Sequence, residues 1–546
     1  AALGLLPTDH DRRLELLIAR ATALGESGSL AESREALLEA LSLLPPGSGP
    51  DRVRLVALLA AVETLLGRHR DAGRRLHGEF ESLADRRSPE AGALQAELAI
   101  REAYAGRFDA IPEHAATAHA IAAETGDAVG EAEAGALLAF GELGRGRPEA
   151  ATRRLDEAAA LLDAADDDAL ARRLGALHYL GHAEQPGERW AQSLRHFERG
   201  VELCRATGQG QLLASMLTGQ AWAALFLGRL DRAQELSEAA VDSARLGANP
   251  LVLVWALLTP TLVGVARGDL TSALVAAEES AELAGRIDVG VFSAQQGWVH
   301  GWALLEAGDA DRCVEVIEGA GLTDPDHLLV VPGGMCITSE LLARAQIERG
   351  RPDDAWLWGE RGIAFSEQSP PGADAAFGLG ARAVGLLEAG QEREAAELAL
   401  RAAAGAMDVG APLIEARSRT LAGRALVAAG EPEAAIRELE RAHGVLRDRG
   451  AVRWADEAAR ELRKLGRRVA RTTRPPVDGA TRLPDLSPRE REVAELVAEG
   501  HTNREVAATL YLSEKTVEGN LRRVFAKLGI SRRGQLGSLL RREGDR

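Results

Sequence analysis

The sequence predicts an all-α protein in which a long array of helix pairs precedes a small helical domain. Three observations predict this fold class. Aromatic residues make up only 4% of the 546 residues, whereas Ala, Leu, Glu and Arg, all good helix formers, are abundant. Glycine recurs about every 40 residues over most of the chain. Near the C-terminus, hydroxyl-bearing residues stand where helices would begin.

Residues 1–465 are predicted to form the repeat array. Each unit consists of an apolar helix, a glycine that ends it, a polar turn, and a second helix led by a small residue, as residues 381–402 show. Glycine suits the left-handed backbone at a helix C-terminus, and a small residue lets two helices approach closely. The unit resembles a tetratricopeptide repeat lengthened by about six residues, and such pairs stack into a superhelix because one pair cannot bury its apolar face alone. The helix-ending glycines are Gly28, Gly67, Gly106, Gly146, Gly187, Gly228, Gly268, Gly308, Gly350, Gly390 and Gly430.

Two segments interrupt this repeat, residues 183–189 and residues 329–336. Either each is a loop insertion, or each contacts a ligand or partner, because loops on a rigid scaffold often carry binding residues. A third stretch, residues 246–266, has no charged residue and is long enough to cross a membrane. Pro250 and Pro260 interrupt it, however, and the repeat requires a buried helix there. We therefore expect packed repeat helices and no membrane contact.

Charge is distributed unevenly along the chain. Residues 451–546 contain 21 Lys and Arg against 14 Asp and Glu, a net charge of +7, and the whole chain carries −17, which leaves −24 for residues 1–450. An acidic array with a basic C-terminal region suggests that nucleic acid meets only that region. Residues 466–485 are rich in arginine, proline and glycine, which predicts a flexible basic linker. Its arginines are either solvated or help to hold phosphates.

Residues 486–546 are predicted to form a separate domain. Ser487, Thr502 and Ser513 each stand at a helix N-cap, and after the first two a glutamate three residues on completes a capping box. Short capped helices joined by tight turns are typical of a helix-turn-helix domain, which binds duplex DNA. On the helix over 514–528, apolar residues at helical spacing face inward and leave cationic and small residues outside.

Ten residues of this domain are assigned to DNA contact by their charge, their hydrogen-bonding groups or their place at a helix start. Any one position alone fits an ordinary solvated helix face, but together they indicate a DNA-binding surface. These residues are Thr502, Asn503, Ser513, Lys515, Thr516, Glu518, Gly519, Arg522, Arg523 and Lys527.

Four motifs in this region form a specific pattern: Arg-Glu-Arg-Glu-Val, Gly-x-Thr-Asn-Arg-Glu-Val-Ala, Ser-x-Lys-Thr-Val and Lys-Leu-Gly-Ile. Residues 486–536, which carry them, resemble the DNA-binding domain of LuxR-type transcription regulators. The resemblance implies a four-helix domain whose third helix enters the major groove and whose fourth makes a dimer contact through Leu536, Leu539 and Leu540. From the residues alone, these leucines belong either to the domain's own core or to a dimer seam. Glu518 and Asn520 stand where many members have Lys and His, which puts the preferred operator in doubt.

The long helical array before this domain resembles the MalT-like group of large ATP-binding LuxR regulators. In that group a nucleotide-binding region comes first, and the helical repeats sense an inducer or partner. A P-loop requires GxxxxGK[ST], and no Gly-Lys pair occurs in this chain. The chain is therefore expected to be the C-terminal portion of such a regulator, without the nucleotide-binding module. A member that lacks the module is the alternative.

These observations predict a cytoplasmic, DNA-binding transcription regulator and not an enzyme. The repeats would sense an unknown inducer or protein partner, and the tail would bind double-stranded promoter DNA as a homodimer, with RNA polymerase as a further candidate partner. The alternative is a repeat scaffold that binds a peptide or protein, with the DNA-binding tail secondary. His178 and His182 could share a helix face, but no HExxH motif, nucleophile elbow or dinucleotide fingerprint accompanies them. No metal site, catalytic residue or cofactor is therefore expected in this chain.

Overall fold

The computed structural model describes residues 12–26, 29–44, 49–247, 249–286, 292–323, 332–469, 488–498, 501–510, 512, 514–528 and 536. Within these ranges every regular element is a helix, which confirms the predicted all-α class. The last helix of the repeat array ends at Lys464. Of the predicted linker over 466–485, residues 470–485 lie outside the described residues.

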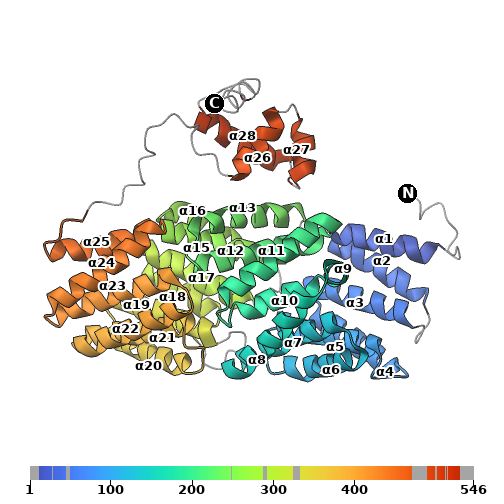
Figure 1. The fold of residues 1–546 in the computed structure, drawn as a ribbon, viewed down its shortest axis with the longest axis horizontal. Coiled ribbons are helices and arrows are strands. Elements are labelled where there is room, and N and C mark those ends of the chain that lie inside the picture. Colours follow the sequence, from blue (N-terminus) through green and yellow to red (C-terminus); the bar gives the residue numbers. More distant parts are fainter. Residues whose placement is uncertain are drawn as a thin grey trace.

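Eleven helix pairs follow one another along the described array, and Figure 1 shows α1 at one end of it and α25 at the other. The first helices of the pairs are α1 (Arg13–Glu26), α3 (Pro50–Leu65), α5 (Pro89–Tyr104), α7 (Ala128–Gly144), α10 (Gly175–Glu184), α12 (Leu213–Phe226), α14 (Pro250–Ala256) with α15 (Leu258–Arg267), α17 (Phe292–Glu306), α19 (Pro332–Glu348), α21 (Ala373–Glu388) and α23 (Pro412–Ala428). The second helices are α2 (Leu30–Ser42), α4 (His69–Ser82), α6 (Ile111–Thr125), α8 (Pro148–Ala164), α11 (Trp190–Thr207), α13 (Leu230–Leu246), α16 (Leu270–Ala284), α18 (Ala310–Gly319), α20 (Pro352–Ser366), α22 (Glu392–Asp408) and α24 (Pro432–Asp448). The remaining elements are α9 (Asp167–Arg172), the 3-10 helix η2 (Gly210–Leu212) and α25 (Val452–Lys464).

The helix-ending glycines set the turns within the pairs. Nine of the eleven predicted glycines have φ between 66° and 86°, the left-handed conformation that glycine adopts without strain. Gly28 lies outside the described residues. The prediction is wrong at Gly187, because the next residue, Glu188, takes the left-handed conformation instead, with φ of 58°. The interruption over 183–189 therefore shifts this turn by one residue.

After the first pair, in which α1 is less buried than α2, the first helices are more deeply buried than the second helices. Every residue of α12 is buried, whereas on α16 only Ala273, Ala277 and Ser280 are. The small residues that the sequence predicts near the start of the second helices are fully buried. They are Ala72, Ala233, Ala273, Ala395 and Ala435. A larger side chain at any of these positions would separate the two helices of a pair, because protein interiors are close-packed.

The charge-free stretch that is long enough to cross a membrane forms two packed helices, α14 and α15, with Leu257 between them. Among the described residues, Pro250–Arg267 is the one helical stretch with the length and hydropathy of a membrane span, and 72% of it is buried inside the structure. This burial confirms the prediction of packed repeat helices.

The array winds far enough for distant repeats to touch. α15 packs against α25, and α12 against α23, although each pair of helices is far apart in the sequence. Glu306, the last residue of α17, accepts hydrogen bonds from Arg344 Nη2 at 2.8 Å and from Arg453 Nε at 2.5 Å. One carboxylate thus links α17, α19 and α25. Beside it, the Cζ atom of Arg417 lies 4.7 Å from the centroid of the Trp302 ring.

The C-terminal domain contains, within the described residues, the three predicted helices α26 (Pro488–Ala498), α27 (Asn503–Leu510) and α28 (Glu514–Leu528). Val493 of α26, Val506 of α27 and Val517 of α28 are fully buried in one core, as the periodicity predicts. Of the fourth helix implied by the LuxR resemblance, only Leu536 is described.

Candidate nucleic-acid interface and cavity

The start of α27 is fixed by the capping box that the sequence predicts. The backbone N of Thr502 donates to Glu505 Oε2 at 2.7 Å, and the backbone N of Glu505 donates to Thr502 Oγ1 at 3.3 Å. The pKa of the Glu505 carboxyl lies below its ordinary value because the backbone N–H and then the hydroxyl of Thr502 donate to it. Two amides that have no partner within the helix are thereby satisfied. The caps predicted at Ser487 and Ser513 lie outside the described residues.

Arg489 joins α26 to the end of α27. Its Nη2 donates to the backbone carbonyl of Leu510 at 2.5 Å, and its Nη1 donates to Glu492 Oε2 at 2.6 Å. A cation at this place satisfies a carbonyl that the helix C-terminus leaves unpaired. Arg489 opens the Arg-Glu-Arg-Glu-Val motif, but its sequence position does not predict this structural role.

α28 presents one buried face and one exposed face. Val517, Leu521 and Val524 are buried in the core of the domain. Glu518 and Arg522 are exposed one helical turn apart, on the side that the sequence assigns to DNA. The structure therefore brings these two predicted DNA-facing residues together on one surface.

Gly519 lies beside this exposed pair. A Cβ atom at Gly519 would meet no heavy atom of the described residues within 4 Å, so packing among these residues does not require a glycine there. A glycine at an open position lets a partner approach the helix backbone closely. Thr502 is exposed, and Asn503 and Thr516 are half-buried at the starts of their helices, where backbone N–H groups can hold phosphate oxygens.

The two departures from the LuxR pattern lie on different sides of α28. Asn520 is 2% exposed, and its Nδ2 donates to the backbone carbonyl of Thr516 at 3.1 Å. Asn520 is thus packed inside the domain, whereas Glu518 is exposed. Of the two, only Glu518 is open to a binding partner of α28.

Leu536 is fully buried in the same core as the three helices. Of the two alternatives that the sequence left open for this leucine, the structure favours the domain's own core. Other predicted contacts stay predictions, because their side chains lie outside what the structure describes. They are Ser513, Lys515, Arg523, Lys527, Leu539 and Leu540.

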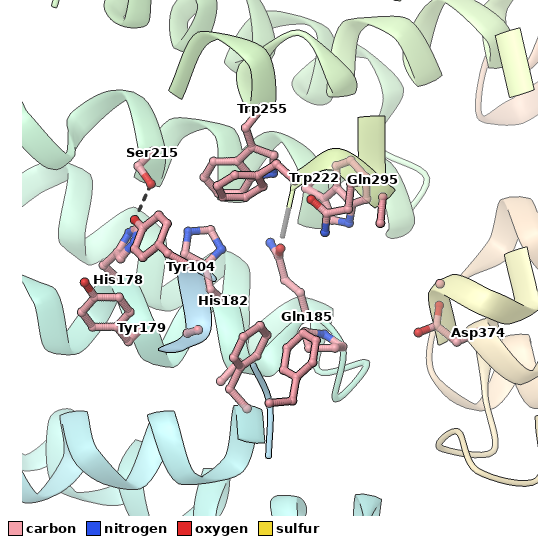
Figure 2. A pocket seen from close by; sticks show the side chains of 18 of the residues that line it. Tyr104, His178, Tyr179, His182, Gln185, Ser215, Trp222, Trp255, Gln295 and Asp374 are labelled. Atoms are coloured by element: carbon pink, nitrogen blue, oxygen red, sulfur yellow. Dashed lines mark hydrogen bonds between the residues drawn. The ribbon is translucent and has the colours of Figure 1, made fainter. Parts of the chain in front are cut away.

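A cavity of about 190 Å³ lies inside the repeat array, where first helices from several pairs meet. Its walls come mainly from α5, α7, α10, α12, α14, α17, α19 and α21. Ten of the 20 aromatic residues in the chain line it. Figure 2 shows His182 and Gln185 pointing toward the space beside Trp255 and Trp222. In a chain with so few aromatic residues, this concentration makes the cavity a candidate binding site.

Both segments that interrupt the repeat reach this cavity. Gln185 and Pro186 of the first and Gly334 of the second lie in its walls. Glu188 accepts a hydrogen bond from the backbone N of Asp374 at 2.5 Å, and Asp374 also lines the cavity. The segments therefore lie where the ligand-contact alternative requires them. The sequence could not show this, because residues far apart in the chain build the site.

The cavity carries no fixed positive charge. Among the described residues that line it, none is lysine or arginine. Burial lowers the pKa of His178 to about 4, and burial followed by the nearby His178 holds the pKa of His182 well below its ordinary value, so both rings are neutral at pH 7. Burial raises the pKa of Asp374 to about 7, and burial together with Asp374 raises that of Glu188.

The two histidines share a face of α10, as their spacing predicts, with ring centroids 4.4 Å apart. His178 Nδ1 lies 3.4 Å from the Oγ atom of Ser215, a contact drawn in Figure 2. In the part of the chain that the structure describes, no group of three or more His, Cys, Asp or Glu side chains is arranged to hold a metal ion.

Comparison with known proteins locates one family in this chain. Residues 484–540 match the family described as bacterial regulatory proteins, luxR family. The spore germination protein GerE of Bacillus subtilis is 42% identical over 62 residues, which cover 11% of this chain and 84% of GerE. The putative HTH-type transcriptional regulator Mb0914c of Mycobacterium bovis is 44% identical over 59 residues, 11% of this chain and only 7% of that protein's length.

Among solved structures, the chain is similar to a Rap protein complexed with competence and sporulation factor. The TM-score is 0.42 at 13% identity, and the match covers 66% of this chain and 100% of the Rap chain. The match to GerE spans most of that protein, and the family match over residues 484–540 includes α26, α27 and α28. The chain therefore belongs to the LuxR family of bacterial regulatory proteins.

Proposed function

We propose that this chain is a cytoplasmic transcription regulator that binds promoter DNA through its C-terminal helix-turn-helix domain and senses a ligand or protein partner through its repeats. The observation that carries the proposal is the exposed face of α28. Glu518, Gly519 and Arg522 stand away from the buried core there, in the domain that matches the LuxR family. A helix with one face anchored in a core and an exposed face that carries a cation is suited to the major groove.

Each group on this face has a chemical role in the proposed complex. Arg522, with Lys515, Arg523 and Lys527, neutralises phosphates or donates to guanine, and Glu518 accepts from cytosine N4. The starts of α27 and α28 hold phosphate oxygens through their N–H groups. Leu539 and Leu540 would form the dimer seam, and RNA polymerase would meet the regulator at the promoter.

The repeat array supports the sensing half of the proposal. Its net charge of −24 over residues 1–450 disfavours contact with DNA, and its interior holds an aromatic-lined cavity. A long helical array that precedes a LuxR-type domain is also the order found in the MalT-like group, to which we assign the chain on this ground.

DNA binding can be tested with the full chain and duplexes enriched from a random-sequence library. We expect one duplex family to outcompete bulk DNA at physiological salt, with affinity falling at a log-log slope of roughly −4 or steeper because at least four phosphates are neutralised. Sequence-blind association alone would contradict the proposal.

Substitutions on α28 test the assignment of the face. Arg522→Ala and Lys515→Ala should each weaken binding about tenfold or more, since a contact to a phosphate or base is worth roughly 1–3 kcal/mol. Arg460→Ala, at an exposed position of α25, is the matched control and should leave the affinity unchanged. If both α28 variants bind like the control, the groove assignment is wrong.

A further inference from the structure

We infer that the cavity of the repeat array binds an uncharged, planar, two-ring aromatic molecule that carries both a hydrogen-bond donor and an acceptor. The inference deepens the sensing role in the proposed function and rests on it only for the consequence of binding. The binding site itself follows from the shape, lining and polar atoms of the cavity.

The size and lining of the cavity indicate the size and shape of the ligand. A cavity of about 150 Å³ holds benzene, so one of about 190 Å³ suits a larger flat molecule. Ten aromatic residues and two histidines are among the 25 residues that line the cavity. Trp190 is stacked on Phe226 at a centroid distance of 4.1 Å, and Trp255 is stacked on Phe292 at 5.4 Å. Flat ring faces and edges on several sides favour a flat ring between them, because aromatic pairs gain about 0.5–1.5 kcal/mol beyond the area that they bury.

The charges around the cavity favour a neutral ligand. An anion would find no lysine, arginine or charged histidine among the described lining residues. A cation would require an ionised carboxylate. Among the described lining residues the one carboxyl is Asp374, which burial favours in its neutral form. Glu188 beside it opposes the ionisation further, because two neighbouring carboxylates repel each other.

Unpartnered polar atoms set the pattern of donors and acceptors. In the described structure, the indole N–H of Trp190, Oε1 of Gln295 and Nε2 of His182 have no hydrogen-bond partner, and all three residues line the cavity. A buried polar atom without a partner costs about 1–3 kcal/mol. A ligand with an acceptor for Trp190 and a donor for Gln295 would satisfy two of these atoms and recover part of that cost.

Calorimetry on the full chain with three two-ring probes of similar size tests the predicted charge and hydrogen-bonding pattern of the ligand. Quinolin-2-one is neutral and has an N–H donor beside a carbonyl acceptor, N-methylquinolinium is a cation, and 2-naphthoate is an anion. We expect quinolin-2-one to bind at least tenfold more tightly than either charged probe. Tighter binding of the cation or of the anion, or no binding of quinolin-2-one, overturns the inference.

Substitutions locate the site. Gln295→Leu removes the acceptor at nearly constant volume and should weaken quinolin-2-one binding about tenfold. Gln296→Leu is the matched control, because Gln296 is buried next to it but does not line the cavity. Ala103→Leu, on another wall, should abolish binding by filling the space. Binding is measured only on variants whose circular dichroism spectrum shows the wild-type helix content. If Gln295→Leu and Ala103→Leu both bind quinolin-2-one like the wild type, the binding site lies elsewhere.

The sensing role is separated from the binding site by a second measurement. Quinolin-2-one should change the affinity of the full chain for an enriched duplex, and the cavity variants should lose this change. Calorimetric binding without any change in DNA affinity would overturn the sensing role and leave the site intact. Loss of DNA binding in every condition would overturn the proposed function and not the ligand inference.

Discussion

Substitution of Glu306 tests how much the ion pairs between distant helices stabilise the superhelical array. The Glu306 side chain is 5% exposed and receives both Arg344 and Arg453. Burial alone would raise its pKa, but the Arg344 guanidinium, followed by Arg417 and Arg453, overcomes this effect and holds the pKa at about 2, against an ordinary value of 4.5. At about 1.4 kcal/mol per pKa unit, the ionised carboxylate contributes about 3 kcal/mol to the folded state at pH 7.

Glu306→Gln should therefore lower the free energy of unfolding by about 3 kcal/mol at pH 7, because it leaves buried guanidinium groups without their counter-charge. The folded pKa lies below the unfolded one, so the contribution is complete above pH 4.5 and is lost as the pH falls toward 2. By pH 3.5 the difference between wild type and variant should shrink to about 2 kcal/mol.

Urea unfolding followed by tryptophan fluorescence measures the effect, since Trp302 and Trp454 stack near this cluster with centroids 6.2 Å apart. Glu282→Gln is the matched control, because its partner Arg286 and Glu282 itself are both about two-thirds exposed (67% and 68%) and such pairs contribute at most about 1 kcal/mol. If Glu306→Gln unfolds at the same urea concentration as this control, or if its deficit does not depend on pH, the reasoning is refuted.

Three further predictions concern packing, capping and the DNA face. Gly219→Ala should lower the free energy of unfolding by about 1–3 kcal/mol, because the added Cβ would overlap the buried Phe197 ring. Gly444→Ala, in open space on a helix, should raise it by about 0.5–1 kcal/mol. Equal shifts of the melting temperature in the two variants would contradict this prediction. Thr502→Ala should lower the stability of α27 by about 1 kcal/mol and so speed its amide hydrogen exchange roughly fivefold. Unchanged exchange would show that the capping box does not stabilise this helix. Gly519→Leu should not lower the melting temperature but should weaken DNA binding at least tenfold. Full DNA binding by this variant would exclude close approach of DNA at this position.

Local features of this chain could be predicted from sequence because neighbouring residues create them. The left-handed turns follow from single glycines, and the capping box at Thr502 needs only Glu505 three residues later. The one wrong turn, at Gly187, is also informative. There Glu188, and not Gly187, takes the left-handed conformation. The carboxylate of Glu188 accepts a hydrogen bond from the backbone N of Asp374, a contact between residues far apart in the sequence.

The cavity could not be predicted because its walls depend on how far the superhelix turns per repeat. Tyr104 and Asp374 line the same space although many repeats separate them. A weak signal was nevertheless present in the sequence. The chain has only eight tryptophans, and Trp222, Trp255 and Trp298, which all line the cavity, come from three successive first helices.

The contacts of α25 with α15 and α17 also bear on how the array folds. In an open solenoid each repeat touches only its neighbours, so folding can nucleate anywhere and stability adds along the chain. Here Arg453 binds Glu306, 147 positions earlier, so part of the native energy is gained only after a long loop has closed. The repeats of this array should therefore melt together, and damage to one turn of the superhelix should be transmitted to the next.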